Sequence, residues 1–160
     1  MIKSPTPKEI KSYEFAPAII DSIIAGLNNK QLHYQPGDNE WSINQVIVHL
    51  ADTEMFFCER MRKVIVEEKP TLQSFDQAEW AKKLIYEKQD YRLALDLLKT
   101  QRKCLASLLH LLPSSFWKRK GIRDGKEVTL YDIFTTALNH IPTHLAQIES
   151  IKSNLNFPSN

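Results

Sequence analysis

The sequence has little of what marks several large protein classes. It contains only two cysteines, Cys58 and Cys104, which lie far apart and outside any metal-binding or redox spacing. We therefore expect no disulfide and no cysteine-based site, and we assign both side chains to core packing. The 21 basic and 19 acidic residues nearly balance, so the basic surface of a nucleic-acid-binding protein is absent.

Long apolar runs are also missing. No run approaches the roughly 18 residues that span a membrane, and residues 1–5 do not form the start of a signal peptide. We therefore expect a cytoplasmic protein that binds neither membranes nor nucleic acid. A length of 160 residues suits one domain with a real core, covering residues 1–160.

What the sequence does contain is four long segments with helical periodicity and few recognisable strands. Their starts and stops, set by capping boxes, prolines and glycines, predict helices at about 6–29, 42–67, 87–113 and 129–152. Residues 70–77 read as a crossover, followed by a short helix near 78–84. The pattern predicts an all-α four-helix bundle with a long crossover between the second and third long helices.

The most informative residues are His140 and His144. Their spacing of four aims both imidazoles in one direction on a helix, which is a metal-chelating geometry. They lie on the apolar stripe that should face the core. The alternative is that both are core histidines whose ring nitrogens are hydrogen-bonded inside the protein and bind no metal.

A mononuclear site needs a third ligand from another helix. His33 falls in a polar loop and His110 at the end of a helix, where a cation is favourable, so both have ordinary explanations. His49 lies on the edge of the apolar stripe of the second long helix and could lean toward the last one.

Between Tyr34 and Ile148 the chain resembles the DinB/YfiT-like metal-binding four-helix bundles. The resemblance rests on the matching residues Pro36–Gly37, Trp41–Glu54, Arg60, Phe75–Gln77, Gly125, Thr129–Leu130, His140, His144 and Gln147–Ile148. It implies an up-up-down-down bundle and a divalent metal on His49, His140 and His144. It also implies activity as a metal-dependent hydrolase or as a transferase of low-molecular-weight thiols such as bacillithiol, and often a homodimer.

Two departures from the family pattern concern the last helix. Many members have Arg-Gly after the last ligand, where this chain has Leu145-Ala146, so an arginine that could face a substrate is absent. Pro142 stands between the two histidines and should kink the helix, because it lacks a backbone N–H.

Three neutral imidazoles leave a coordination position open, as in catalytic rather than structural sites. Imidazole suits zinc, nickel, copper or iron; we expect zinc or nickel, with iron or manganese as alternatives. Position 141 is isoleucine, so the His-Glu-x-x-His signature of zincin proteases is absent. A metal that lowers the pKa of a coordinated thiol needs no separate base.

Two charged residues are also candidates. Glu54 and Arg102 both fall on apolar helix faces, where an unpaired charge would be costly, so we expect an ion pair between them. Such a pair could orient a ligand or a metal-bound water, and we list both residues as candidate catalytic residues. It could equally be a structural core pair.

Three functions remain open from the sequence. The first is an enzyme that transfers a small thiol to an electrophile, or a metal-dependent hydrolase. The second is a metal-binding stress-response module without turnover, and the third is a purely structural bundle. The basic run from Lys118 to Arg123 is either a solvated loop or an attractor for an anionic substrate. Trp80 and Trp117 are packing groups or walls of a cleft.

Overall fold

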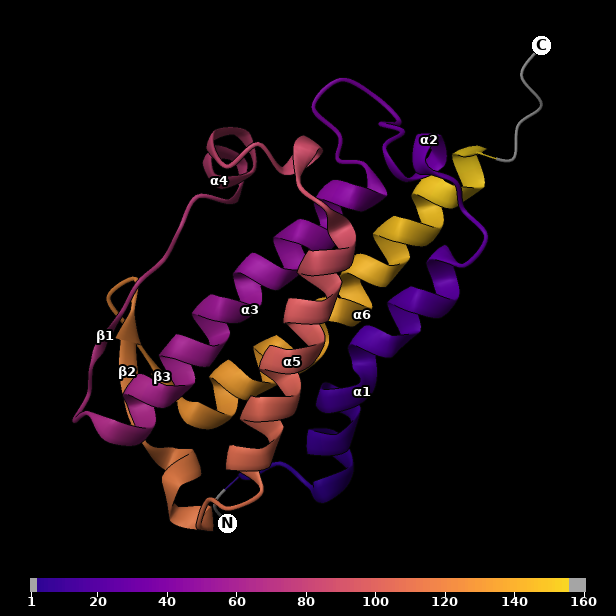
Figure 1. Cartoon of the computed structure of the whole chain (residues 1–160). Coiled ribbons are helices and arrows are strands. Elements are labelled where there is room, and N and C mark those ends of the chain that lie inside the picture. The colour runs from indigo at the N-terminus through magenta and orange to yellow at the C-terminus, as the bar shows by residue number, and fades with distance from the viewer. Residues whose placement is uncertain (1–2, 156–160) are drawn as a thin grey trace.

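Four long helices pack side by side along most of the molecule (Figure 1). The computed structural model describes residues 3–155. The long helices are α1 (Pro7–Ile24), α3 (Ile43–Val66), α5 (Tyr91–Leu109) and α6 (Leu130–Leu155). The connections carry the short helices α2 (Asn29–Leu32) and α4 (Gln77–Lys83) and the 3-10 turns η1 (Tyr86–Lys88) and η2 (Ser114–Lys118). The predicted four-helix bundle is confirmed.

Helix starts follow the capping signals in the sequence. In α1 the Glu9 amide donates to Thr6 Oγ1 at 3.2 Å while Glu9 Oε2 accepts from the Thr6 amide at 2.7 Å. In α3 the Gln45 amide donates to Ser42 Oγ at 3.3 Å, and Gln45 Oε1 accepts from the Ser42 amide at 2.9 Å. These reciprocal bonds satisfy backbone donors that have no partner inside the helix.

The order of helix directions differs from the expected one. In Figure 1, α1 and α6 run upward while α3 and α5 run downward, which is an up-down-down-up order and not up-up-down-down. The connection over residues 25–42, which includes α2, stays at one end of the bundle, so α3 returns antiparallel to α1. The crossover from residue 67 to residue 90 then climbs the full bundle and makes α3 and α5 parallel, as its length predicts.

The third long helix starts later than expected. Its expected start near Glu87 lies instead in η1, which follows Ile85 in the left-handed conformation (φ 54°). The α5 helix begins after Asp90, whose carboxylate accepts from the Arg92 amide at 2.9 Å. The start of α5 is therefore set by the Asp90 cap, although the helical periodicity of the sequence begins earlier.

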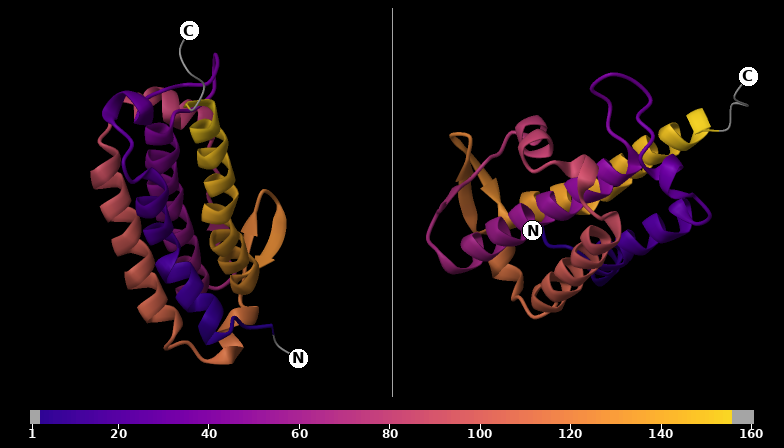
Figure 2. Two further views of the ribbon diagram at one scale, coloured as in Figure 1. Left: turned by 90° about the vertical axis from the view of Figure 1, so that its right-hand side faces the viewer. Right: turned by 45° about the horizontal axis from the view of Figure 1, so that its top comes forward.

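A small sheet, missed in the sequence, lies beside the start of α6 (Figure 2). Strands β2 (Lys120–Arg123) and β3 (Lys126–Thr129) form an antiparallel hairpin, and β1 (Thr71–Leu72) pairs parallel with β2. Asp124 and Gly125 both have positive φ in the hairpin turn, as an Asp-Gly turn requires. The strands are too short for their periodicity to predict them.

Most of the apolar core divides into two clusters along the bundle axis, and a third, small cluster of Val48, Ala81 and Tyr86 lies where α4 and η1 meet α3. Of the two main clusters, one contains the start of α1, the ends of α3 and α5 and the start of α6; the other contains the opposite halves of the same helices. Between them lies a level of polar side chains, including Glu54, Arg102 and His140. Buried polar side chains need hydrogen-bond or ionic partners inside the bundle. The candidate functional residues therefore lie at this polar level.

Candidate metal centre

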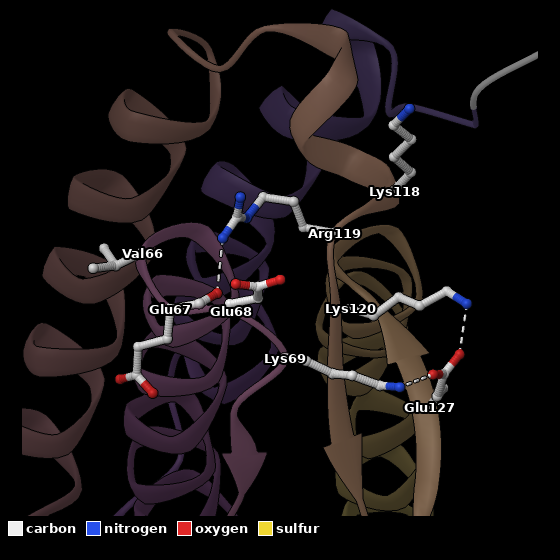
Figure 3. A pocket seen from close by; sticks show the side chains of 8 residues that line it. All are labelled: Val66, Glu67, Glu68, Lys69, Lys118, Arg119, Lys120 and Glu127. Atoms are coloured by element: carbon white, nitrogen blue, oxygen red, sulfur yellow. Dashed lines mark hydrogen bonds and ion pairs between the residues drawn. The ribbon is translucent and has the colours of Figure 1, made fainter.

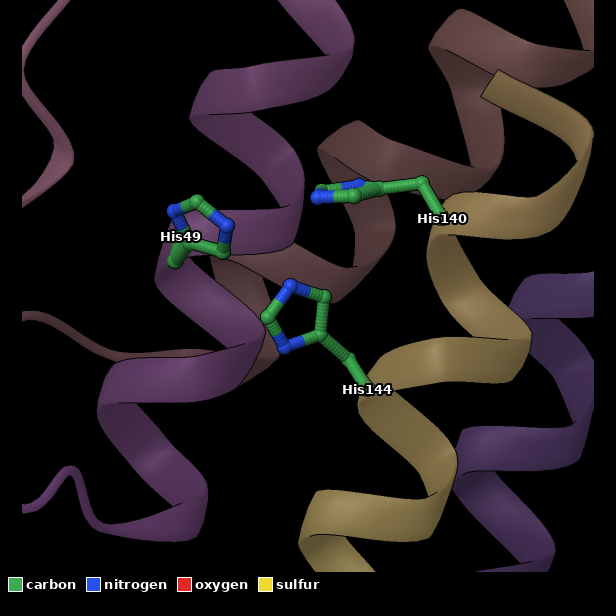
Figure 4. A group of neighbouring side chains, drawn as sticks. All are labelled: His49, His140 and His144. Carbon is green, nitrogen blue, oxygen red and sulfur yellow. The ribbon is translucent and has the colours of Figure 1, made fainter. Parts of the chain in front are cut away.

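The three histidines converge between α3 and α6 (Figure 4). His49 projects from α3, His140 and His144 project from α6, and one ring nitrogen of each lies within 4.8 Å of those of the other two. Ring centroids are 4.7 to 5.3 Å apart. A tetrahedral zinc holds its nitrogen ligands roughly 3.3 Å apart, so small side-chain rotations suffice to close this set around an ion. The α6 helix runs through Pro142 without ending, so both of its histidines stay on one helix.

Neighbouring side chains orient two of the rings. His144 Nδ1 lies 2.8 Å from Gln147 Oε1 and donates to it, which leaves Nε2 free to act as a ligand. Thr53 Oγ1 lies 3.3 Å from His49 Nδ1, one helical turn away. The Trp41 ring packs on His49 with centroids 4.8 Å apart.

All three histidines are held in the neutral form. Burial, with a contribution from His144, lowers the pKa of His49 to about 3. Burial and the two neighbouring imidazoles lower the pKa of His140 to about 3 as well. Burial lowers the pKa of His144, and the hydrogen bond to Gln147 opposes that shift. Only neutral imidazole binds a metal, so the rings are ready to act as ligands.

One nitrogen in this group lacks a partner. His140 Nδ1 is buried and has no hydrogen bond within residues 3–155. An unsatisfied buried polar atom costs about 1–3 kcal/mol. Its place in a converging set of three imidazoles fits a metal-binding role better than a set of satisfied core histidines.

The predicted Glu54–Arg102 ion pair is present. Arg102 Nε donates to Glu54 Oε2 at 2.8 Å, and the hydroxyl of Tyr13 donates to Glu54 Oε1. All three side chains are fully buried. Burial, together with the Glu54 charge, raises the pKa of the Tyr13 hydroxyl well above its usual value, so Tyr13 remains a donor. Both carboxylate oxygens of Glu54 are therefore occupied within the core.

Arg102 also joins the pair to two other helices. Its Nη1 donates to the Tyr13 carbonyl of α1 at 3.1 Å, and its Nη2 donates to the Ala137 carbonyl of α6 at 2.7 Å. The Tyr13 carbonyl is free because the residue four positions on, Pro17, has no N–H. Ala137 lies one turn before His140. Arg102 thus links the α1 carbonyl left free by Pro17 to α6, the helix that carries His140 and His144.

A groove of about 360 Å³ lies at the loop before α3, and none of the three histidines lines it. It shares Trp41, which contacts His49, and Gln147, which bonds to His144. Its other lining is mainly polar and includes Asn39, Glu40, Ser150 and Asn154. A small polar molecule in this groove would touch the groups that orient the histidines.

Comparison with known proteins agrees with this geometry. The family model of the DinB superfamily matches residues 12–148. The chain belongs to the DinB superfamily. A protein of Oceanobacillus iheyensis named "Putative metal-dependent hydrolase" is 31% identical over 153 residues, covering 89% of this chain and 83% of its own length. The Bacillus subtilis protein "Putative metal-dependent hydrolase YfiT" is 27% identical over 151 residues, covering 93% and 85%.

The solved structure of Bacillus subtilis YfiT shares the fold. It aligns with a TM-score of 0.88 and 24% identity over 97% of this chain and 92% of that one. Its title describes a probable metal-dependent hydrolase with an unusual four-helix bundle topology. No helix within residues 3–155 of this DinB superfamily chain is long and apolar enough to cross a membrane.

The basic run of this DinB superfamily member lies at the end of α3 (Figure 3). Arg119 donates to the carbonyls of Val64 at 2.7 Å and Glu67 at 2.8 Å, where the α3 carbonyls have no helical partner. Lys120 and Lys69 both pair with Glu127. These partners give Arg119 and Lys120 structural roles, and the run lies in η2 and β2 and not in the solvated loop that the sequence suggested.

The remaining candidates fall outside the histidine group. His33 and His110 are exposed. Cys58 is buried, and burial raises the pKa of its thiol to about 11, so it is an unreactive packing group; Cys104, expected in the core, is exposed. Trp117 is a core residue. The orienting roles of Thr53 and Gln147 were missed, although their spacing of four and three from a histidine was a usable signal.

Proposed function

We propose that this protein is a metal-dependent enzyme that transfers a low-molecular-weight thiol, of the bacillithiol kind, to an electrophile. His49, His140 and His144 would hold the divalent metal, with zinc or nickel expected and iron or manganese as alternatives. The observation that carries the proposal is the all-histidine group. Among the described residues no carboxylate completes this group, so three imidazoles would leave a coordination position open on a bound metal.

The chemistry requires little from the other side chains. A bound divalent metal lowers the pKa of a coordinated thiol or water. In the transfer the thiol sulfur forms a bond to carbon, the bond from that carbon to its leaving group breaks, the leaving group departs as an anion, and the thiol proton goes to solvent. The polar groove beside Trp41 and Gln147 suits a thiol that carries amide or hydroxyl groups.

We assign Glu54 and Arg102 to positioning. Neither side chain is exposed, and both oxygens of Glu54 already accept hydrogen bonds. The Arg102 bond to the Ala137 carbonyl fixes the α6 segment that precedes His140. We propose that this pair sets the aim of the histidines and does not touch the substrate.

Metal-dependent hydrolysis is the second candidate, and Asp52 favours it. Asp52 is half-buried, lies one turn after His49 and accepts a 2.6 Å hydrogen bond from the Tyr86 hydroxyl. Burial raises the pKa of its carboxyl. Such a group could take a proton from water, and the relatives above are named as hydrolases. A metal-binding module without turnover, which the missing arginine would fit, is the outcome if neither activity is found.

Metal content is the first test. We expect about one divalent metal per chain after reloading with zinc or nickel, measured by elemental analysis. His144→Ala should lose it, because two imidazoles hold a metal far more weakly than three. His110→Ala, an exposed histidine at the end of α5, is the matched control and should keep it. Equal metal content in all three proteins would exclude the site.

Activity is the second test. The metal-loaded protein is assayed with cysteine, glutathione and bacillithiol against a chromogenic electrophile, beside His49→Ala and His110→Ala. We expect a thiol-dependent rate that only His49→Ala abolishes. An unchanged rate in His49→Ala would show that the reaction does not depend on a metal held by these histidines. If no thiol gives a rate, an ester and amide screen with Asp52→Asn tests the hydrolase.

A further inference from the structure

A pocket of about 300 Å³ lies on the outer face of α3, apart from the polar groove. Met55, Phe56 and Trp80 provide its apolar lining, and Glu59 and Gln73 complete it. Met55 is 40% exposed although it stands on a long packed helix. Concave apolar surface of this size is typical of small-molecule sites.

The pocket walls are held in place by the crossover. Phe75 stacks on Phe56 with centroids 4.1 Å apart and planes 11° from parallel, and the Trp80 ring packs against both at 4.9 and 5.2 Å. Arg60 donates to the Gln73 carbonyl at 3.0 Å and lies over the Phe56 ring. Walls fixed in this way lose little freedom when a ligand binds.

The charge that lines the pocket is negative. Glu59 forms an ion pair with Lys63 at 3.0 Å through Oε1, its Oε2 is buried without a partner within residues 3–155, and the Arg60 guanidinium donates to the Gln73 carbonyl. An anionic ligand would therefore face the Glu59 carboxylate in a largely apolar space, which is costly. An uncharged aromatic ring matches the lining, because it can pack against Trp80 and Met55.

The pocket lies within reach of the histidines. Phe56 follows His49 by seven residues, so it stands two turns along the same face of α3, about 10.5 Å away along the axis. Thr53, which contacts His49, lies between them. Phe57, next to Phe56, packs against His140 with centroids 5.5 Å apart. A molecule with its ring in the pocket and a chain that spans this distance could present its reactive carbon to the histidine group.

We propose that this pocket binds an uncharged aromatic group on the electrophilic substrate. The inference rests on the proposed function and specifies it: the thiol approaches through the polar groove, and the acceptor is recognised through its ring. The transfer remains the one written above, in which the sulfur–carbon bond forms and the leaving group departs as an anion.

Binding tests the pocket without turnover or metal. Calorimetry with 2-naphthylmethanol should give a measurable Kd for the wild-type protein, both metal-free and metal-loaded. Met55→Lys places a charge at the pocket and should weaken binding roughly tenfold or more. Leu93→Lys, the same kind of change at an exposed apolar residue of α5, is the matched control and should leave the Kd unchanged. The charged analogue 2-naphthoate should bind more weakly than the alcohol.

Kinetics then tests the role in substrate choice. If a thiol-dependent rate exists, Met55→Lys should lower kcat/KM roughly tenfold for an alkyl bromide that carries an aryl ring at the far end of a chain long enough to span this distance, relative to the same alkyl bromide without the ring, with unchanged metal content. The proposed binding site is wrong if 2-naphthylmethanol does not bind, or if Met55→Lys and Leu93→Lys weaken its binding equally. Either result would hold even if the transferase activity is real. Intact binding without any thiol-dependent rate leaves the pocket as a ligand site and overturns its assignment to the electrophile.

Discussion

The metal-free protein should lose stability between pH 7 and pH 5 because of two buried histidines. His49 and His140 have pKa values near 3 in the folded state, against 6.5 as the ordinary value. The folded pKa is depressed, so the unfolded chain takes up protons that the folded protein does not. The stability that depends on neutral imidazole is complete above pH 6.5 and falls as the pH drops below it.

The magnitude follows from these values. Between pH 7 and pH 5 each histidine should cost about 2 kcal/mol, since one pKa unit corresponds to about 1.4 kcal/mol and most of the interval lies below 6.5. The pair together should cost about 4 kcal/mol, a large part of the roughly 5–15 kcal/mol that stabilises a domain. Bound metal would offset part of this loss, because it binds only the folded protein.

Urea unfolding in the presence of a chelator, at pH 7 and pH 5, measures the effect. We expect His49→Leu to lose about half of the wild-type difference in the free energy of unfolding. His110→Leu should retain all of it. Carboxyl groups contribute equally in these proteins, so their effect cancels when variants are compared. An unfolding free energy that is equal at both pH values in the wild type would refute the reasoning.

Two further outcomes are expected. Arg102→Met leaves the Glu54 carboxylate buried without its partner and should lower the free energy of unfolding by about 3–5 kcal/mol. Adding Glu54→Leu to Arg102→Met removes the buried charge and should recover part of that lost stability. Urea titrations that rank the double variant as the least stable protein would contradict this. We also expect a homodimer at micromolar concentration, because several large apolar side chains are exposed; a monomeric mass by light scattering in the wild type would exclude it.

Much of the bundle was predictable because its signals are local. The capping boxes at Thr6 and Ser42 placed two helix starts, and the spacing of His140 and His144 placed two imidazoles on one face of α6. The expectation that His49 leans toward α6 also agrees with the geometry. The capping boxes and the histidine spacing depend on residues within one or two turns of each other, whereas the approach of His49 to α6 was inferred from its place on the apolar stripe of α3.

What was not predictable depends on contacts between distant segments. The up-down-down-up order is set by where the connection over residues 25–42 and the crossover run, and neither has a periodicity that gives a direction. The β1–β2 pairing joins residues about fifty positions apart. The clustering of Phe56, Phe75 and Trp80 likewise follows from how the crossover folds back on α3.

The Arg102 contacts have a consequence for how the bundle moves. The Arg102 guanidinium of α5 donates to Glu54 of α3 and to carbonyls of α1 and α6, so α5 is tied to the other three long helices at a single level. If one helix detached, it would leave a buried charge or carbonyl without its partner, so partial opening is costly. The middle of the bundle should therefore unfold as one cooperative unit, and any motion that admits a small molecule should occur in the loops and the crossover at its edge.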